Sequence, residues 1–184
     1  EDNKPYFAKV YTISKFDYHS INLFKREATI TSELNHPAII KYVGYCEFNI
    51  ASRKPFRKSS DHLYLSLVQE YFPNGDLDDM INNPADEWNE TNKLKVIIGI
   101  ASAMNYLYEK NIIHRDLKPE NIILNENFEP TICDFEYARH FNSKYIPMTT
   151  AIGTPVHEAP ELLASCTFYK SVVDSYSFGV ILYQ

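Results

Sequence analysis

Cysteine is scarce in this chain, with three residues among 184. Cys46, Cys133 and Cys166 are odd in number and far apart, so they form neither a disulfide framework nor the paired spacing of a zinc site. This cysteine usage fits a reducing, intracellular setting. We therefore expect a cytoplasmic protein.

A long apolar run is also missing. The longest one, from Val96 to Tyr108, is interrupted by Ser102 and Asn105 and is too short to span a bilayer. No signal-peptide pattern follows Glu1, and because no methionine precedes it we expect the natural start to lie elsewhere. A membrane anchor outside this stretch stays open.

Positive charge is not in excess. The chain has 18 basic and 24 acidic residues and a net charge of −6, so no overall field favours nucleic acid or an anionic membrane as a partner. One basic cluster is present, and we interpret it as a solvated loop tip rather than a docking patch. It consists of Arg53, Lys54, Arg57 and Lys58.

Hydrophobic residues make up 45% of the chain and charged residues 23%, as in a globular domain with a core. The aromatic and β-branched run from Tyr6 to Thr12 predicts a strand, and helical spacing predicts a helix from Ser20 to Leu34. Pro37 prevents that helix from continuing. Two further strands are predicted from Ile39 to Phe48 and from His62 to Glu70.

The second half of the chain is predicted to be mainly helical. The clearest helix runs from Thr91 to Lys110, after a short one that Asp76 caps and that ends near Asn83. Ile122 to Leu124 and Pro130 to Cys133 predict a hairpin, and Val172 to Gln184 predicts a buried helix. The apolar face of the long helix is predicted to consist of Leu94, Ile97, Ile98, Ala101, Met104 or Asn105, and Tyr108.

The chemistry concentrates in the stretch from Ile112 to Leu124, which reads IIHRDLKPENIIL. So many charged residues between two apolar runs predict a loop held by its hydrophobic ends. Asp116 can accept a proton from an alcohol, Lys118 can neutralise a phosphate oxygen, and Asn121 can bind a hard cation through its carbonyl. One loop therefore combines a proton acceptor, a cation for phosphate and a ligand for a metal ion.

The stretch His114 to Asn121, HRDLKPEN, resembles the catalytic loop of protein kinases at every specified position. Asp134-Phe135 and Ala159-Pro160-Glu161 follow in the order of that family. The resemblance implies an α+β, bilobal fold. Residues 1–72 would form a small, β-rich and incomplete N-lobe without the glycine-rich loop, and residues 73–184 a mainly helical C-lobe truncated within its central helix.

The resemblance also implies a site for ATP and Mg²⁺. Lys9, held by Glu27, would contact the phosphates, while Asn121 and Asp134 would bind the metal. Gln69 occupies the gatekeeper position, and Asp174 would brace the catalytic loop. The remaining residues implied at the nucleotide are Glu70 and Phe72, through their backbone, together with Ile123 and Cys133.

The segment from Glu136 to Glu161 resembles the activation segment of the family. Thr150, with Thr149 as a close competitor, corresponds to the position whose phosphate pairs with the arginine beside the catalytic aspartate, here Arg115. On the substrate side, Lys118 and Thr154 are similar to serine/threonine kinases. His157 and Glu158 stand where tyrosine and an apolar residue are usual.

The sequence therefore predicts a protein serine/threonine kinase with protein substrates. The stretches EYFPNGDL and SYSFGVIL are similar to its tyrosine-kinase-like branch. Without the glycine-rich loop to cover the phosphates, we expect these 184 residues in isolation to be nearly inactive.

A pseudokinase that signals by contact is the alternative. Two departures favour it: Glu136 replaces the glycine of Asp-Phe-Gly, and Phe7 replaces a small alanine under the adenine, where it could fill the pocket. The four residues most often lost in inactive kinases are nevertheless all present, which favours catalysis. They are Lys9, Asp116, Asn121 and Asp134.

Overall fold

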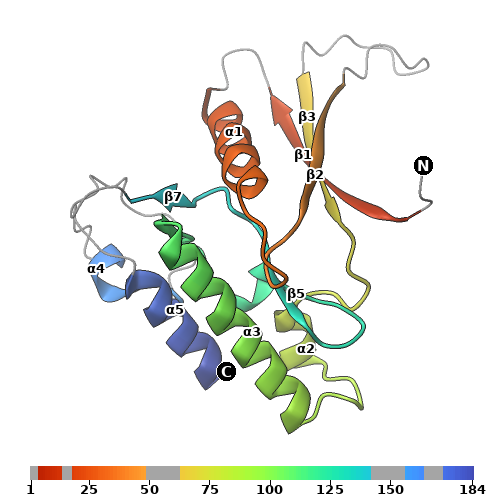
Figure 1. Ribbon diagram of the computed structural model, residues 1–184, viewed down its shortest axis with the longest axis vertical. Helices are drawn as coiled ribbons and strands as arrows, with labels where there is room; N and C mark the ends of the chain where they lie inside the picture. The colour runs from red at the N-terminus through yellow and green to blue at the C-terminus, as the bar shows by residue number, and fades with distance from the viewer. Residues whose placement is uncertain (1–3, 14–17, 49–62, 142–155, 164–171) are drawn as a thin grey trace.

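The computed structural model describes residues 4–13, 18–48, 63–141, 156–163 and 172–184. A three-stranded sheet with one long helix, α1 (Tyr18–Ser32), lies at one end of the molecule (Figure 1). Helices α2 (Leu77–Asn82), α3 (Glu90–Glu109) and α5 (Val172–Tyr183) lie at the other end. The expected α+β, bilobal fold is therefore present. Cys166 and the basic cluster of residues 53–58 lie outside the described residues.

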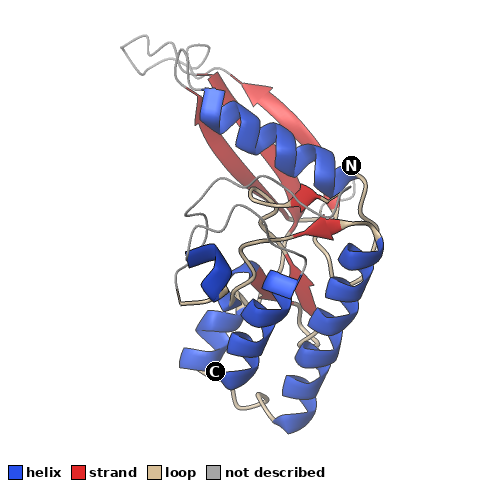
Figure 2. Cartoon of the chain, turned by 90° about the vertical axis from the view of Figure 1, so that its left-hand side faces the viewer, coloured by secondary structure: helices blue, strands red, loops and turns tan. Residues whose placement is uncertain are grey.

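The sheet is antiparallel, with the strand order β1-β3-β2. Its strands are β1 (Tyr6–Ile13), β2 (Tyr42–Phe48) and β3 (Leu63–Glu70). Side chains alternate between the two faces of a strand, so Lys9, Tyr11 and Ile13 share one face of β1, which packs against α1. Figure 2 shows α1 lying along the sheet. This alternation brings a lysine to the inner face of the sheet.

Helix α1 (Tyr18–Ser32) begins and ends two residues before the predicted bounds. It buries Phe24, whose ring meets that of Tyr11 edge to face at 5.6 Å, and it buries Glu27 completely. The strand predicted from Ile39 begins only at Tyr42, because Ile39 instead makes an isolated bridge to Ile132 beneath the sheet. That bridge joins the two ends of the molecule.

Helix α2 (Leu77–Asn82) is capped by Asp76 as predicted, and helix α3 (Glu90–Glu109) is capped by Asn89. The predicted apolar face of α3 is wrong. Leu94, Ile98 and Tyr108 are 55%, 60% and 59% exposed. The residues that α3 buries are Val96, Ile100, Ala103 and Leu107.

The predicted hairpin is present as β5 (Ile122–Leu124) and β6 (Pro130–Ile132), and it packs on α3. The turn η2 (Pro119–Asn121) precedes it. The pairing of β4 (Ile112–Ile113) with β7 (Arg139–His140) was not predicted, because a two-residue strand leaves no periodicity to read.

Two helices complete the described chain, α4 (Pro160–Leu163) and α5 (Val172–Tyr183). The main core lies between α3, the hairpin and α5, and a smaller one lies between the sheet and α1. Within the described ranges, no helix has the length and apolar character needed to cross a membrane.

Candidate active site

The loop after β4 is held from below by a buried carboxylate. Asp174 of α5 accepts hydrogen bonds from the backbone N–H groups of His114 (2.7 Å) and Arg115 (2.8 Å). Burial raises the pKa of Asp174, while His114 and the two backbone donors act in the opposite direction. Arg115 has a φ of 69°, so the loop is fixed in a conformation that costs strain and needs this support.

Three polar side chains of the loop meet one another. Asn121 donates from Nδ2 to the backbone oxygen of Asp116 (2.8 Å) and to its carboxylate (3.0 Å). Lys118 Nζ lies 3.3 Å from the same carboxylate. Because Nδ2 makes both bonds to Asp116, the amide oxygen of Asn121 is the atom left to bind a cation.

His114 connects this loop to the segment after β6. Its Nε2 lies 3.0 Å from the backbone oxygen of Cys133, and its ring meets the fully buried Phe135 edge to face at 4.8 Å. Asp134, which lies between Cys133 and Phe135 in the chain, has a φ of 63°, and the chain turns at this residue. Cys133 N also donates to Asn121 O (2.9 Å), so this backbone bond joins the two segments that carry the candidate metal ligands Asn121 and Asp134.

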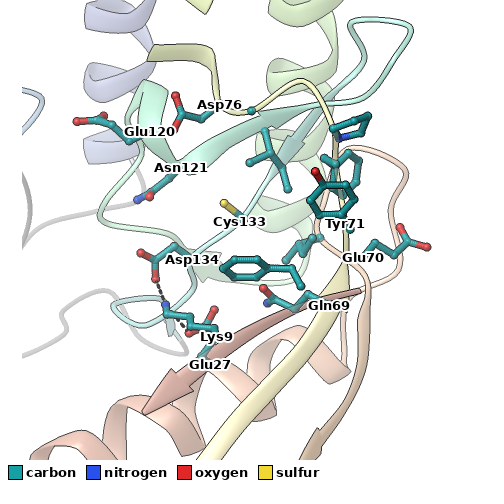
Figure 3. A pocket seen from close by; sticks show the side chains of 16 residues that line it. Lys9, Glu27, Gln69, Glu70, Tyr71, Asp76, Glu120, Asn121, Cys133 and Asp134 are labelled. Atoms are coloured by element: carbon teal, nitrogen blue, oxygen red, sulfur yellow. Dashed lines mark hydrogen bonds and ion pairs between the residues drawn. The ribbon is translucent and has the colours of Figure 1, made fainter. Parts of the chain in front are cut away.

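Lys9 is surrounded by three carboxylates. Its Nζ lies 2.9 Å from Glu27, 2.7 Å from Asp134 and 2.8 Å from Glu136 (Figure 3 shows the first two). Burial alone would lower the pKa of Lys9, but Glu27 and Asp134 outweigh it and hold the pKa above its ordinary value. The lysine therefore stays charged.

Glu27 also accepts a hydrogen bond from the hydroxyl of Tyr11. Burial raises the pKa of Glu27, and Lys9 and Tyr11 oppose that shift. Tyr11 was missed as a site residue. Its signal was available, because it lies two residues after Lys9 on one strand and so shares its face.

A cavity of about 510 Å³ opens between the sheet and the hairpin (Figure 3). It is lined by all the residues expected at the nucleotide and the metal: Lys9, Glu27, Glu70, Phe72, Asn121, Ile123, Cys133 and Asp134. Asp116 and Lys118 do not line it, but Asn121 ties Asp116 to its edge.

The cavity suits a small organic ligand. Its volume falls within the usual range of ligand pockets, roughly 300–1,000 Å³. Gln69 lines it with a buried Nε2 that has no hydrogen-bond partner among the described residues. Phe7 lines the cavity without filling it and is 52% exposed. Burial, with Asp134 and Glu27, raises the pKa of the Cys133 thiol to about 12, which favours the protonated thiol at neutral pH.

The regulatory and substrate-side residues are only partly described. Arg115 donates from Nε to the backbone oxygen of Tyr137 (2.6 Å). Glu158 is buried near Asp116, and burial followed by the Asp116 charge raises the pKa of Glu158. Thr149, Thr150 and Thr154 lie outside the described residues.

Comparison with known proteins identifies the arrangement. The protein kinase domain family matches residues 1–184. A probable serine/threonine-protein kinase of Dictyostelium discoideum is 36% identical over 161 residues, which cover 88% of this chain and 16% of that protein. The serine/threonine-protein kinase CTR1 of Arabidopsis thaliana is 33% identical over 174 residues, covering 91% of this chain and 20% of that protein.

A putative serine/threonine-protein kinase/receptor of Acanthamoeba polyphaga mimivirus is 34% identical over 163 residues, covering 88% of this chain and 9% of that protein. The chain thus spans between 9% and 20% of the length of these three relatives.

Proposed function

The chain belongs to the protein kinase domain family, and from that membership we propose that it transfers the γ-phosphoryl group of ATP to serine or threonine hydroxyls of protein substrates. One observation carries the proposal. Lys9, Asp134 and Asn121 line one cavity, and Asn121 holds the carboxylate of Asp116 at its edge.

The residues of the cavity fit ATP and Mg²⁺. The adenine would contact the backbone of Glu70 and Phe72 and the side chains of Ile123 and Cys133, and the partnerless Nε2 of Gln69 offers a further donor. We propose that the two lobes meet after Phe72, so that residues 1–72 form one lobe and residues 73–184 the other. Asp134 and Asn121 supply the oxygen ligands that Mg²⁺ prefers, and the bound metal would neutralise phosphate charge.

Each charged residue then has a role that its contacts support. Lys9, oriented by Glu27, binds the phosphates. Asp116 takes the proton of the substrate hydroxyl while the hydroxyl oxygen bonds to the γ-phosphorus and the bond to the leaving ADP oxygen breaks. Lys118, 3.3 Å from Asp116, offsets charge on the transferring group.

Regulation would follow from the activation segment. Phosphate on Thr150 or Thr149 would pair with Arg115, and Thr154 would help to position a serine or threonine substrate. For localisation we propose the cytoplasm, since Cys46 and Cys133 are both free thiols.

A pseudokinase is the second candidate, favoured by the contact of Glu136 with Lys9. A lysine held by three carboxylates is less available to phosphates. The intact Asp116, Asn121 and Asp134 favour the active enzyme over this alternative.

Substitution of Asp116 tests the function. In the full-length protein, with magnesium and a generic serine/threonine substrate, Asp116→Asn should lower turnover by roughly 10²–10⁴-fold while ATP binding persists. Asp86→Asn, the same chemical change at an exposed position that does not line the cavity, is the control. Full activity in Asp116→Asn would refute the assigned role. Absence of turnover in the folded, phosphorylated wild type would favour the pseudokinase.

A further inference from the structure

Glu136 stands where the family has glycine, and its side chain is directed inward. The carboxylate reaches Lys9 Nζ at 2.8 Å, and the Glu136 side chain is only 18% exposed. Its backbone oxygen accepts a hydrogen bond from Arg26 Nη1 of α1 at 3.0 Å. The residue is therefore held on both sides, by the helix and by the lysine of the sheet.

The contact uses up the hydrogen-bonding capacity of Lys9. An ammonium group has three N–H donors, and Glu27, Asp134 and Glu136 offer three acceptors between 2.7 and 2.9 Å away. With glycine at position 136, one donor would be left for a phosphate oxygen. Here a phosphate can bind Lys9 only when a carboxylate leaves it.

The net charge of Lys9 and its three carboxylate partners also opposes the binding of a phosphate. One ammonium and three carboxylates leave two uncompensated negative charges close to the position that the phosphates would take. Burial strengthens this repulsion, because Glu27 has no exposed surface and Lys9 is only 24% exposed.

Glu136 is the carboxylate that replaces the glycine of the family pattern, and it has no other assigned role. Glu27 is fully buried and is also bonded by Tyr11, while Asp134 is the proposed metal ligand. We propose that Glu136 is a specificity-determining residue of the nucleotide site, which competes with nucleotide phosphates for Lys9. Glu136 thereby lowers the affinity for ATP without affecting ligands that lack phosphate. This proposal rests on the proposed function, because it requires that the cavity binds a nucleotide.

The alternative hypothesis is that the three carboxylates bind a metal ion. Ligand oxygens of Glu27, Asp134 and Glu136 lie within 4.8 Å of one another, close enough to share a cation. The Lys9 ammonium already lies among them and supplies that positive charge. The two hypotheses predict opposite changes in ATP affinity when the Glu136 charge is removed.

The experiment is a calorimetric titration of the full-length protein with ATP and with adenosine, each in EDTA and in MgCl₂. Glu136→Gln removes the charge and keeps the backbone bond to Arg26. We expect it to bind ATP about tenfold more tightly than wild type in EDTA, the factor for losing one competing charged hydrogen bond. Adenosine affinity should stay within about twofold, since adenosine has no phosphate to compete for Lys9.

Two further variants make the result specific. Glu120→Gln removes the same charge from an exposed residue that lines the cavity but has no ion pair to Lys9 in the described structure. Its effect on ATP affinity should be several-fold smaller than that of Glu136→Gln. Glu136→Gly restores the family residue and should tighten ATP binding in the same direction as Glu136→Gln.

The other outcomes overturn the proposal. Equal ATP affinity in Glu136→Gln and wild type would show that no competition exists and would leave the proposed function intact. If Glu136→Gln bound ATP more weakly than wild type in MgCl₂, Glu136 would be a metal ligand instead of a competitor of the phosphates. Failure of every variant to bind either ATP or adenosine would overturn this inference and the nucleotide site together.

Discussion

Glu27 has no exposed surface, and its charge is tolerated because Lys9 and Tyr11 bind the same oxygen. Removing one partner of a buried ion pair leaves an uncompensated charge. We therefore expect Lys9→Met to lower the free energy of unfolding by about 3 kcal/mol. For a chain of this size the melting temperature should fall by roughly 6–12 °C.

The pH dependence of that variant follows from the pKa of Glu27, which burial already raises and which loses the opposing effect of Lys9. A carboxyl group with a raised pKa binds its proton more tightly in the folded than in the unfolded state, so stability increases as the pH falls. The loss in Lys9→Met should accordingly be smaller at about pH 5 than at about pH 8.

The double variant Lys9→Met/Glu27→Gln is the control for this prediction. It removes the lysine together with the buried charge, so it should recover most of the lost stability, and thermal melts of all four combinations give the coupling energy. If the two single effects simply add, Lys9 does not stabilise Glu27.

At the residue scale, the sequence indicated which residues gather at the candidate site better than it indicated the contacts between them. Asp116, Asn121 and Asp134 could be named because fixed spacing in one loop and one turn identifies them. The bond of Tyr11 to Glu27 and the ion pair of Glu136 with Lys9 could not be predicted, because they join a strand, a helix and a distant turn. Strand alternation predicts only that Tyr11 and Lys9 share a face. Only the tertiary fold sets those distances.

At the scale of elements, α3 shows where periodicity fails. Apolar residues of α3 lie on more than one side of the helix. Both the predicted face around Ile98 and the observed face around Ile100 therefore satisfy the helical spacing. The face is selected by the neighbour, because the hairpin packs on the side that carries Gly99. The existence and the approximate bounds of the helix could be predicted from its own residues, whereas its orientation depends on the hairpin around Pro130.

Gly99 makes that selection testable. A Cβ added at Gly99 would lie 2.4 Å from Cγ and 2.8 Å from Cδ of Pro130, whose ring cannot move aside. Alanine is favoured over glycine in a helix by about 1 kcal/mol, but overpacking costs typically about 1–3 kcal/mol. We expect Gly99→Ala to destabilise the protein on balance in urea denaturation.

Gly179→Ala in α5 is the matched control, because no atom of the described residues lies within 4 Å of the added Cβ. There the propensity gain acts alone, so this variant should be as stable as wild type or more stable by up to about 1 kcal/mol. If Gly99→Ala and Gly179→Ala shift the urea midpoint equally, the close approach of α3 to the hairpin is refuted.

At the scale of the whole molecule, the described helices leave apolar surface uncovered. Leu94 and Ile97 of α3 are 55% and 38% exposed, and Leu182 of α5 is 49% exposed. All three line a groove of about 710 Å³ between α2, α3 and α5. A contiguous apolar surface of this kind binds hydrophobic dyes.

We therefore expect the 184-residue chain to enhance the fluorescence of anilinonaphthalene sulfonate while its near-ultraviolet circular dichroism stays that of a folded protein. The double variant Leu94→Glu/Ile97→Glu should reduce the dye signal severalfold, with little change in melting temperature because both side chains already contact water.

Ile100→Glu is the contrasting variant. Ile100 lines the same groove but is 1% exposed, so a buried unpaired charge there should unfold the core and increase dye binding. A dye signal that Leu94→Glu/Ile97→Glu leaves unchanged would place the dye elsewhere, and it would mean that this face is covered in solution.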